Sequence, residues 1–360
     1  MKNIVYIGKY NGVVGGIERY MQKSADVLRR NGLSVHYLYT ENGGYDQEKF
    51  TGAFDSVQEF SLSTDLLTDC DLIIIHNIIP VEIMEQLPLE KSFFFVHDHN
   101  IYCQRHHYYT PVGRKNCHRK YNKLVCKICS LGRNSAPPLA AYRKFPALVL
   151  SDFMLKNLQK NGFEKVVKLP AFIRSESVRR SFMPDGVLRI LFLGQLIRGK
   201  GADLMLKTLS KLDIPFSCTV AGDGKDRIML EKMVEKFKLC DKVHFTGFVS
   251  EPEKLWSDCD VFFFPIRWQE PFGLVGLEAM AHGVPVVAFD LGGVREYVNE
   301  STGELIPEKD IAHAAEVLKQ LYLHPERLGG FSGNGLELVA NKFSEENFVE
   351  RFKKLPEMRS

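Results

Sequence analysis

Two glutamates, Glu270 and Glu278, stand eight residues apart in the segment of the chain best suited to chemistry. A strand predicted at 261–266 precedes them and another at 285–290 follows, both rich in apolar residues and of a length typical of a buried strand. We therefore expect Glu270 in the loop that leaves a parallel strand and Glu278 in the helix that follows. Carboxylates at both places could bind the hydroxyl groups of a sugar and of a ribose.

The backbone of the same segment suits a phosphate. Phe272, Gly273 and Leu274 are expected at the start of the helix, where N–H groups without a partner attract anions. A sugar joined to a diphosphate needs this combination of carboxylates and amides.

A second glycine-rich loop follows the strand predicted at 189–194 and carries Gln195, Arg198 and Lys200. A lysine among glycines can meet a diphosphate as a point charge. The alternative is an ordinary solvated cation in a loop. The position between a strand and a helix favours the phosphate.

Gly15 and Gly16 follow the first predicted strand and open a helix from residue 17. They allow a phosphate or sugar to approach the backbone closely, or they form an ordinary turn. The spacing is not G-x-G-x-x-G, so it does not predict a dinucleotide site. His97 ends a strongly apolar strand on the side where parallel sheets bind ligands, and we predict that it bonds to the sugar or acceptor.

Four cysteines, Cys103, Cys117, Cys126 and Cys129, lie close together in the sequence. Four thiolates can bind zinc tetrahedrally, but only one pair has C-x-x-C spacing. A structural zinc, a redox-sensitive or disulfide-forming group, and unlinked thiols all remain open. Two Asp-Cys-Asp triplets, at 69–71 and 258–260, are expected at the amino ends of strands, away from ligands. We predict no catalytic metal.

The candidate residues lie in a sequence where short apolar runs alternate with helical patterns. The strands and helices that these patterns predict would hold the residues in place. Such runs are typical of parallel strands covered on both faces. The fold class is therefore α/β, with two doubly wound Rossmann-like sheets facing across a cleft. The predicted organisation is a first domain at 1–173, a linker at 174–187, a second domain at 188–342, and a final helix at about 343–360 that packs back on the first domain. The strands are expected near 3–8, 35–40, 72–77, 92–97, 147–151, 166–170, 189–194, 216–221, 243–248, 261–266, 285–290 and 303–306.

Composition is that of a globular protein, with 360 residues, 45% apolar and 25% charged. No apolar run approaches the ~18–20 residues of a membrane span, and the start of the chain has no signal-peptide pattern. We expect a cytoplasmic protein.

The net charge of +3 hides a basic segment at 101–151, which holds ten Lys and Arg and no Asp or Glu. This segment is an uneven solvated surface, or it binds an acidic acceptor or the anionic inner face of the cell membrane. Nucleic acid is not an expected partner because no known binding motif is present.

Together these motifs resemble the family 4 (GT4) retaining glycosyltransferases, which adopt the GT-B fold, along nearly the whole chain. The residues that carry the resemblance are Gly15–Glu18, Gly194–Gly201, the E-x7-E run from Glu270 to Glu278, and Gly292–Val298. The cysteine-rich stretch resembles an insertion found in a subgroup of that family.

By position, the resemblance implies that Lys200 binds the donor diphosphate, Glu270 the donor sugar and Glu278 the ribose. Gly16 would approach the phosphates and His97 the sugar. Relatives often have arginine where Gln195 stands, so either Arg198 compensates or the phosphate depends more on Lys200.

The implied reaction moves a sugar from a UDP- or GDP-sugar to a hydroxyl of a glycan or lipid-linked acceptor, without a metal. Bacterial surface polysaccharide or lipopolysaccharide synthesis is the implied setting. A nucleotide-sugar epimerase of the same architecture and a non-catalytic sugar-nucleotide-binding protein are the alternatives.

Overall fold

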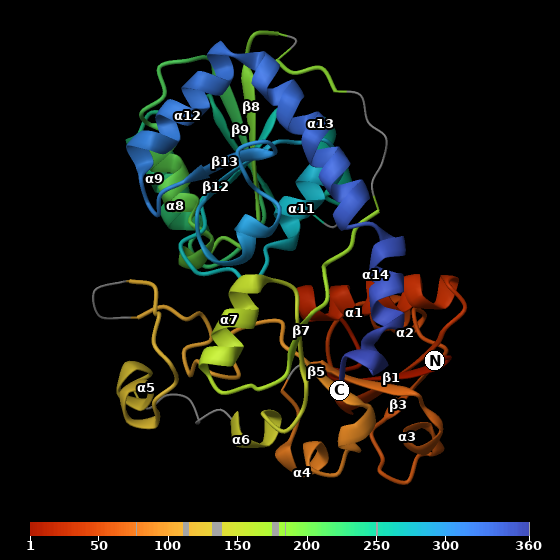
Figure 1. Cartoon of the computed structure of the whole chain (residues 1–360). Helices are drawn as coiled ribbons and strands as arrows, with labels where there is room; N and C mark the ends of the chain where they lie inside the picture. Colours follow the sequence, from red (N-terminus) through yellow and green to blue (C-terminus); the bar gives the residue numbers. More distant parts are fainter. Residues whose placement is uncertain are drawn as a thin grey trace. The chain divides into compact units, whose positions relative to one another are not determined.

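The chain folds into two compact units, which Figure 1 colours along the sequence. One unit comprises Met1–Pro170 with Glu345–Ser360, and the other comprises Ala171–Ser344. The first unit thus ends at Pro170, three residues before the predicted domain boundary at residue 173. Of the predicted linker, residues 175–179 and 184 lie outside the described residues. The structure, a computed structural model, describes residues 1–76, 78–110, 115–131, 139–174, 180–183, 185–249 and 251–359.

The first unit is built on a sheet of seven strands in the order β3-β2-β1-β4-β5-β6-β7. All neighbouring strands are parallel. The chain runs outward from β1 to β3 and then returns to the other side of β1, so the winding reverses between β1 and β4. The strands are β1 (Asn3–Tyr10), β2 (Ser34–Glu41), β3 (Ser56–Glu59), β4 (Leu72–His76), β5 (Ser92–Phe95), β6 (Ala147–Val149) and β7 (Val166–Lys168).

The second unit has a parallel sheet of six strands in the order β10-β9-β8-β11-β12-β13. Its winding reverses between β8 and β11. The strands are β8 (Leu188–Leu193), β9 (Phe216–Ala221), β10 (Val243–Gly247), β11 (Val261–Phe264), β12 (Val286–Phe289) and β13 (Gly303–Ile306). The prediction of two doubly wound parallel sheets is confirmed, and the predicted cleft between the domains stays a prediction.

In the first unit, α1 (Gly16–Arg30) and the last helix, α14 (Glu345–Lys353), lie side by side (Figure 1). The Arg30 guanidinium is 3.1 Å from the Glu345 carboxylate and links the two ends of the chain within this unit. The other helices are α2 (Gln47–Thr51), α3 (Asp65–Asp69), α4 (Val81–Met84), η1 (Leu89–Lys91), α5 (Lys123–Cys129), α6 (Leu139–Tyr142), α7 (Asp152–Lys160) and η4 (Leu355–Arg359).

In the second unit, helices cover the sheet, and α8 packs on α12 while α11 packs on α13. None of the helices in the described parts of either unit is long and apolar enough to span a membrane. The helices of this unit are η2 (Arg198–Lys200), α8 (Ala202–Leu209), α9 (Arg227–Lys236), α10 (Glu253–Ser257), α11 (Leu274–Ala281), η3 (Gly292–Glu296), α12 (Ile311–Leu323) and α13 (Pro325–Lys342).

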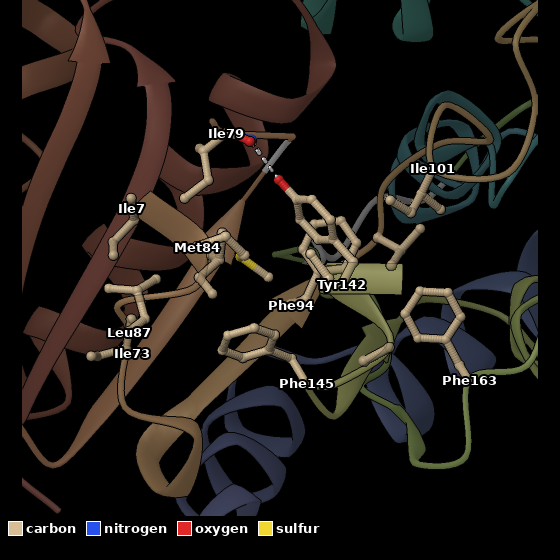
Figure 2. Packing of buried hydrophobic residues seen from close by; sticks show 14 of the residues in the cluster. Ile7, Ile73, Ile79, Met84, Leu87, Phe94, Ile101, Tyr142, Phe145 and Phe163 are labelled. Atoms are coloured by element: carbon tan, nitrogen blue, oxygen red, sulfur yellow. Dashed lines mark hydrogen bonds between the residues drawn. The ribbon is translucent and has the colours of Figure 1, made fainter. Parts of the chain in front are cut away.

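A buried tyrosine fixes the loop that leaves β4 (Figure 2). The Tyr142 hydroxyl accepts a hydrogen bond from the Ile79 amide at 2.7 Å and donates to the Ile79 carbonyl at 2.9 Å. The tyrosine ring packs on Phe94 of β5, with ring centroids 4.3 Å apart. This contact holds the loop against the sheet at the end of the strand where ligands are expected.

Candidate active site

Lys200 and Glu270 meet at the point where the winding of the second sheet reverses. Lys200 ends η2 in the loop after β8, and Glu270 lies in the loop after the neighbouring strand β11. Open parallel sheets bind ligands beyond the carboxyl ends of the strands at this reversal. The Lys200 ammonium donates to the Glu270 carboxylate, and the two side chains keep 28% and 16% of their surface exposed. A ligand can therefore reach the pair.

The two loops that carry this pair are packed together through Gly199. A Cβ atom at Gly199 would lie 1.9 Å from the ring of Trp268, so only glycine fits under the indole. The Arg267 amide donates to the Gly199 carbonyl at 2.9 Å. This contact fixes the backbone on which Lys200 stands.

Arg267 adds a buried ionic support that the sequence analysis missed. Its guanidinium lies 2.6 Å from both carboxylate oxygens of Asp203, the second residue of α8. It also donates to the Arg198 carbonyl at 3.2 Å. The only sequence signal was a charged residue immediately after a wholly apolar strand, which is equally typical of a solvated loop.

Helix α11 begins a few residues after Glu270, so backbone donors follow the same loop. The first N–H groups of any α-helix have no partner within the helix, and here they belong to the turn that begins at Gly273 and Leu274. Phe272 is buried and packs on Tyr297, with ring centroids 5.4 Å apart, so it offers its amide and not its ring.

Tyr297 holds the helix start in place. Its hydroxyl donates to the Gly273 carbonyl at 2.8 Å. Burial, helped by the Glu270 carboxylate, raises the tyrosine pKa well above its usual range, so the hydroxyl keeps its proton.

The loop at 291–293 positions the backbone of Glu270. The Gly293 amide donates to the Glu270 carbonyl at 2.8 Å. Gly292 has φ of 70°, and a Cβ atom there would lie 2.1 Å from the same carbonyl oxygen. Of the remaining predicted residues in this unit, Glu278 lies half-buried in α11, whereas Gln195 and Arg198 are exposed.

In the first unit, Gly15 caps α1 and Gly16 is its first residue. The Gly15 amide donates to the Glu18 carboxylate at 2.9 Å. A Cβ atom at either glycine would meet no atom within 4 Å, so packing does not explain these glycines. The open space leaves room for a ligand at the helix start.

His97 is paired with a second histidine that the sequence analysis overlooked. His76, the last residue of β4, places Nδ1 2.9 Å from Nε2 of His97. Burial lowers the pKa of His97 to about 3 and the pKa of His76 well below its usual value, so both rings are neutral. A neutral imidazole has one donor and one acceptor nitrogen, so the bond couples the two tautomers.

Tyr20 of α1 packs its ring 5.3 Å from the ring of His97. Helix α1, which Gly15 and Gly16 begin, is therefore next to the histidine pair. The structure places these predicted residues around the reversal point of the first sheet, between β1 and β4.

The four predicted zinc ligands line one cavity of about 230 Å³, and none of them is in a disulfide. Within the described ranges, no three His, Cys, Asp or Glu side chains are placed to hold a metal ion. Zinc binding would require the thiols to rotate toward a common centre. A structural zinc stays a prediction, and so does the cysteine-rich subgroup.

The Asp-Cys-Asp triplets have structural partners. The Asp71 carboxylate accepts the amides of Lys2 and Asn3 at 2.6 and 3.0 Å. The buried Asp260 carboxylate accepts the Arg189 amide at 2.8 Å and pairs with the Arg189 guanidinium at 2.9 Å. Each carboxylate therefore anchors the start of the first strand of its sheet.

Comparison with known proteins identifies sugar-transferring relatives. Residues 174–336 match the family described as glycosyl transferases group 1. The lipopolysaccharide core biosynthesis mannosyltransferase LpsB of Rhizobium meliloti is 30% identical over 241 residues, which cover 64% of this chain and 66% of that protein. The D-inositol 3-phosphate glycosyltransferase of an Arthrobacter species is 32% identical over 203 residues, covering 54% of this chain and 48% of the relative. The matched part thus spans about half to two thirds of these two relatives.

Similar solved structures support the fold. The crystal structure of Anabaena Alr3699/HepE in complex with UDP and glucose has a TM-score of 0.73, with 15% identity, and 98% of each chain is covered. At this identity the likeness shows the fold alone, and it confirms the GT-B fold that the sequence resemblance implies.

Proposed function

Because the chain belongs to the glycosyl transferases group 1 family, we propose that it transfers a sugar from a nucleoside-diphosphate sugar to a hydroxyl group with retention of the anomeric configuration. The observation that carries the proposal is the Lys200–Glu270 pair at the reversal point of the second sheet. This pair places a cation and a carboxylate where a diphosphate and its sugar would lie next to each other. UDP and GDP are the candidate nucleotides.

Lys200 and the first amides of α11 would stabilise the leaving diphosphate. Loss of the diphosphate leaves an oxocarbenium-like sugar, and negative charge grows on the phosphate oxygens. Fixed donors aimed at growing charge lower a barrier more than groups that bind substrate and transition state equally. In the absence of donor, Glu270 neutralises Lys200. With donor bound, Lys200 turns to the diphosphate and Glu270 accepts hydrogen bonds from sugar hydroxyls.

Glu270 and Glu278 are thus donor-binding groups and not the acid and base of a glycosidase. Glu278, farther along α11, binds the ribose. A departing phosphate oxygen takes the proton of the acceptor hydroxyl on the same face of the sugar. Lys200 supplies the positive charge and the helix amides supply neutral hydrogen-bond donors, so the proposed reaction needs no metal.

The first unit contributes Gly15 and Gly16, which leave space at a helix start, and His97, whose neutral ring can accept or donate a hydrogen bond. We assign the acceptor to a glycan or a lipid-linked glycan in surface polysaccharide or lipopolysaccharide synthesis, at the cytoplasmic face of a membrane. The similarity to LpsB, a mannosyltransferase of lipopolysaccharide core biosynthesis, supports this assignment.

The test is release of nucleotide from a panel of UDP- and GDP-sugars, with water or added glycans as the acceptor. Glu270→Gln and Glu278→Gln should each lower kcat/KM by roughly 10- to 100-fold, the worth of a hydrogen bond to a charged group. Glu316→Gln, an exposed change on α12, is the matched control and should have no effect.

Two other outcomes would contradict the proposal. An isomerised donor without nucleotide release would identify an epimerase. Slow hydrolysis that is the same in all three variants would identify a non-catalytic sugar-nucleotide-binding protein.

A further inference from the structure

Helix α5 turns large apolar side chains toward solvent. Leu124 and Ile128 are four residues apart, on one face of the helix, and keep 69% and 67% of their surface exposed. Leu131, two residues beyond the end of the helix, is 66% exposed. Elsewhere in the described ranges, no three large apolar residues this exposed lie within eight positions of one another.

The opposite side of α5 borders a cavity of the same unit. Cys126 and Cys129, three residues apart, line the 230 Å³ cavity together with Val125. The Asn122 side chain caps the helix by accepting the Val125 amide at 3.0 Å. Cys126 and Cys129 are only half-buried and the rest of the helix is exposed, so the side chains of Leu124 and Ile128 are not part of the core of the unit. Figure 1 shows α5 at the outer edge of the first unit, away from the strands.

Positive charge surrounds the exposed leucines and isoleucine. The segment from 101 to 151 has no acidic residue. Five exposed basic residues lie within α5 or shortly before it in the sequence, and none of them forms an ion pair with any described residue. They are Lys115, Arg119, Lys120, Lys123 and Lys127. Arg114 and Arg133, also in this segment, lie outside the described residues.

Exposed apolar side chains bordered by lysines are typical of a helix that lies in the interface of an anionic bilayer. The apolar groups enter the acyl region while the long lysine stems keep their ammonium groups at the phosphates. A protein partner that covered a leucine patch would be expected to bring acidic groups to these lysines, whereas a bilayer supplies both apolar depth and negative charge.

We propose that the exposed side chains of α5, Leu124 and Ile128 with Lys123 and Lys127, together with the flanking Lys120 and Leu131, dock the first unit on an anionic lipid bilayer. Docking would place the unit at the surface from which a lipid-linked acceptor is presented. The binding itself requires no turnover and does not depend on the proposed reaction.

The experiment is flotation of the full chain with vesicles of phosphatidylcholine alone and of equimolar phosphatidylcholine and phosphatidylglycerol. The wild-type chain should float with the anionic vesicles only and should dissociate as salt is raised, because screening weakens the headgroup contacts. Leu124→Ser with Ile128→Ser should lower the partition coefficient by at least about tenfold, and Lys120→Gln with Lys123→Gln and Lys127→Gln by a similar factor.

The matched control removes equally accessible apolar groups from the second unit. Ile228 and Met229 of α9 are 69% and 44% exposed, and Ile228→Ser with Met229→Ser should leave flotation unchanged. A tryptophan reporter, Ile128→Trp, should shift its fluorescence to the blue with anionic vesicles. Wild-type-like circular dichroism of each variant shows that a loss is not unfolding.

The proposal is overturned if the wild-type chain does not bind anionic vesicles or binds neutral vesicles equally well. It is overturned too if the α5 variants float with anionic vesicles as well as the wild type does. It is also overturned if those substitutions convert a dimer into a monomer without changing flotation, since the face would then join two copies of the chain. Lys200→Ala should abolish donor turnover and leave flotation intact, so failure of the reaction and failure of docking are distinguishable.

Discussion

The Lys200 ammonium and the Glu270 carboxylate form an ion pair although 70 positions separate them in the chain. The sheet order brings them together, because β8 and β11 are neighbours and each residue follows the carboxyl end of its strand. Glycines make the pairing possible. Gly199 lets Trp268 pack on the first loop, and Gly292 lets the 291–293 loop bond to the Glu270 backbone.

The substitution Gly16→Ala should weaken ligand binding without harming the stability of the fold. A methyl group there meets no protein atom, so the free energy of unfolding should rise by roughly 0.5 kcal/mol as the unfolded chain loses freedom. The same methyl group would occupy the space proposed for the donor, and kcat/KM should fall by roughly 10- to 100-fold. Urea unfolding and donor turnover measure the two effects.

Gly330→Ala is the control for that change. Gly330 lies inside α13 and also has open space around a Cβ position, so its variant should gain stability and keep full activity. If Gly16→Ala also keeps full activity, Gly16 does not border the donor.

Arg267→Ala should destabilise the second unit by about 3 kcal/mol, because it leaves the Asp203 carboxylate partly buried without its guanidinium partner. The measurement is urea unfolding at neutral pH. Arg227→Ala, which removes an exposed pair with Glu231 on α9, should have little effect. Equal small effects of the two substitutions would show that Arg267 does not support the loop.

Acid should destabilise the first unit through its two neutral histidines. Their pKa values are lowered on folding, to about 3 for His97, whereas an unfolded histidine has a pKa near 6.5. Between these values the unfolded chain binds protons that the folded chain does not, so stability is complete above pH ~6.5 and falls as the pH drops. From pH ~7 to ~5 His97 should cost about 2 kcal/mol of the free energy of unfolding, and His76 adds a loss in the same direction.

Urea titrations at several pH values test this, with His97→Gln expected to flatten the acid loss. Asp98 acts in the opposite sense, since burial raises its pKa and the folded chain then holds the proton more firmly. Asp98→Asn should therefore make the acid loss steeper. An acid loss that is the same in wild type and His97→Gln would mean that the histidine is charged in the folded protein.

The sequence allowed the sheets to be predicted because strands covered on both faces are short apolar runs, as in β4 and β11, whose residues are all buried. The missed strand is β3, Ser56–Glu59, which lies at an edge of its sheet and is polar and partly exposed. It pairs with β2, whose residues lie 20 positions earlier in the chain, and a local sequence pattern does not reveal such a pairing. Helix α5 was missed for a related reason, since its exposed apolar face and basic residues do not give the usual amphipathic pattern.

For the site, position at strand ends led us to predict Lys200, Glu270 and His97, and the structure places all three after the carboxyl ends of their strands. Their roles stay predictions. Supporting residues were not predictable in the same way. In the sequence, His76 is one more residue of a predicted strand, and Arg267 is a charged residue in the loop after another. Their roles depend on burial against partners that are distant in the chain, namely His97 and Asp203.

Calorimetric titration of UDP and GDP into the wild-type chain and Lys200→Ala tests most directly whether a diphosphate binds at the Lys200–Glu270 pair. One nucleotide should bind the wild type, and its Kd should rise at least about tenfold in Lys200→Ala, with partial recovery in Lys200→Arg. The folded stability of Lys200→Ala should change little, since the ion pair is partly solvated. An unchanged Kd in a folded Lys200→Ala protein would contradict the assignment.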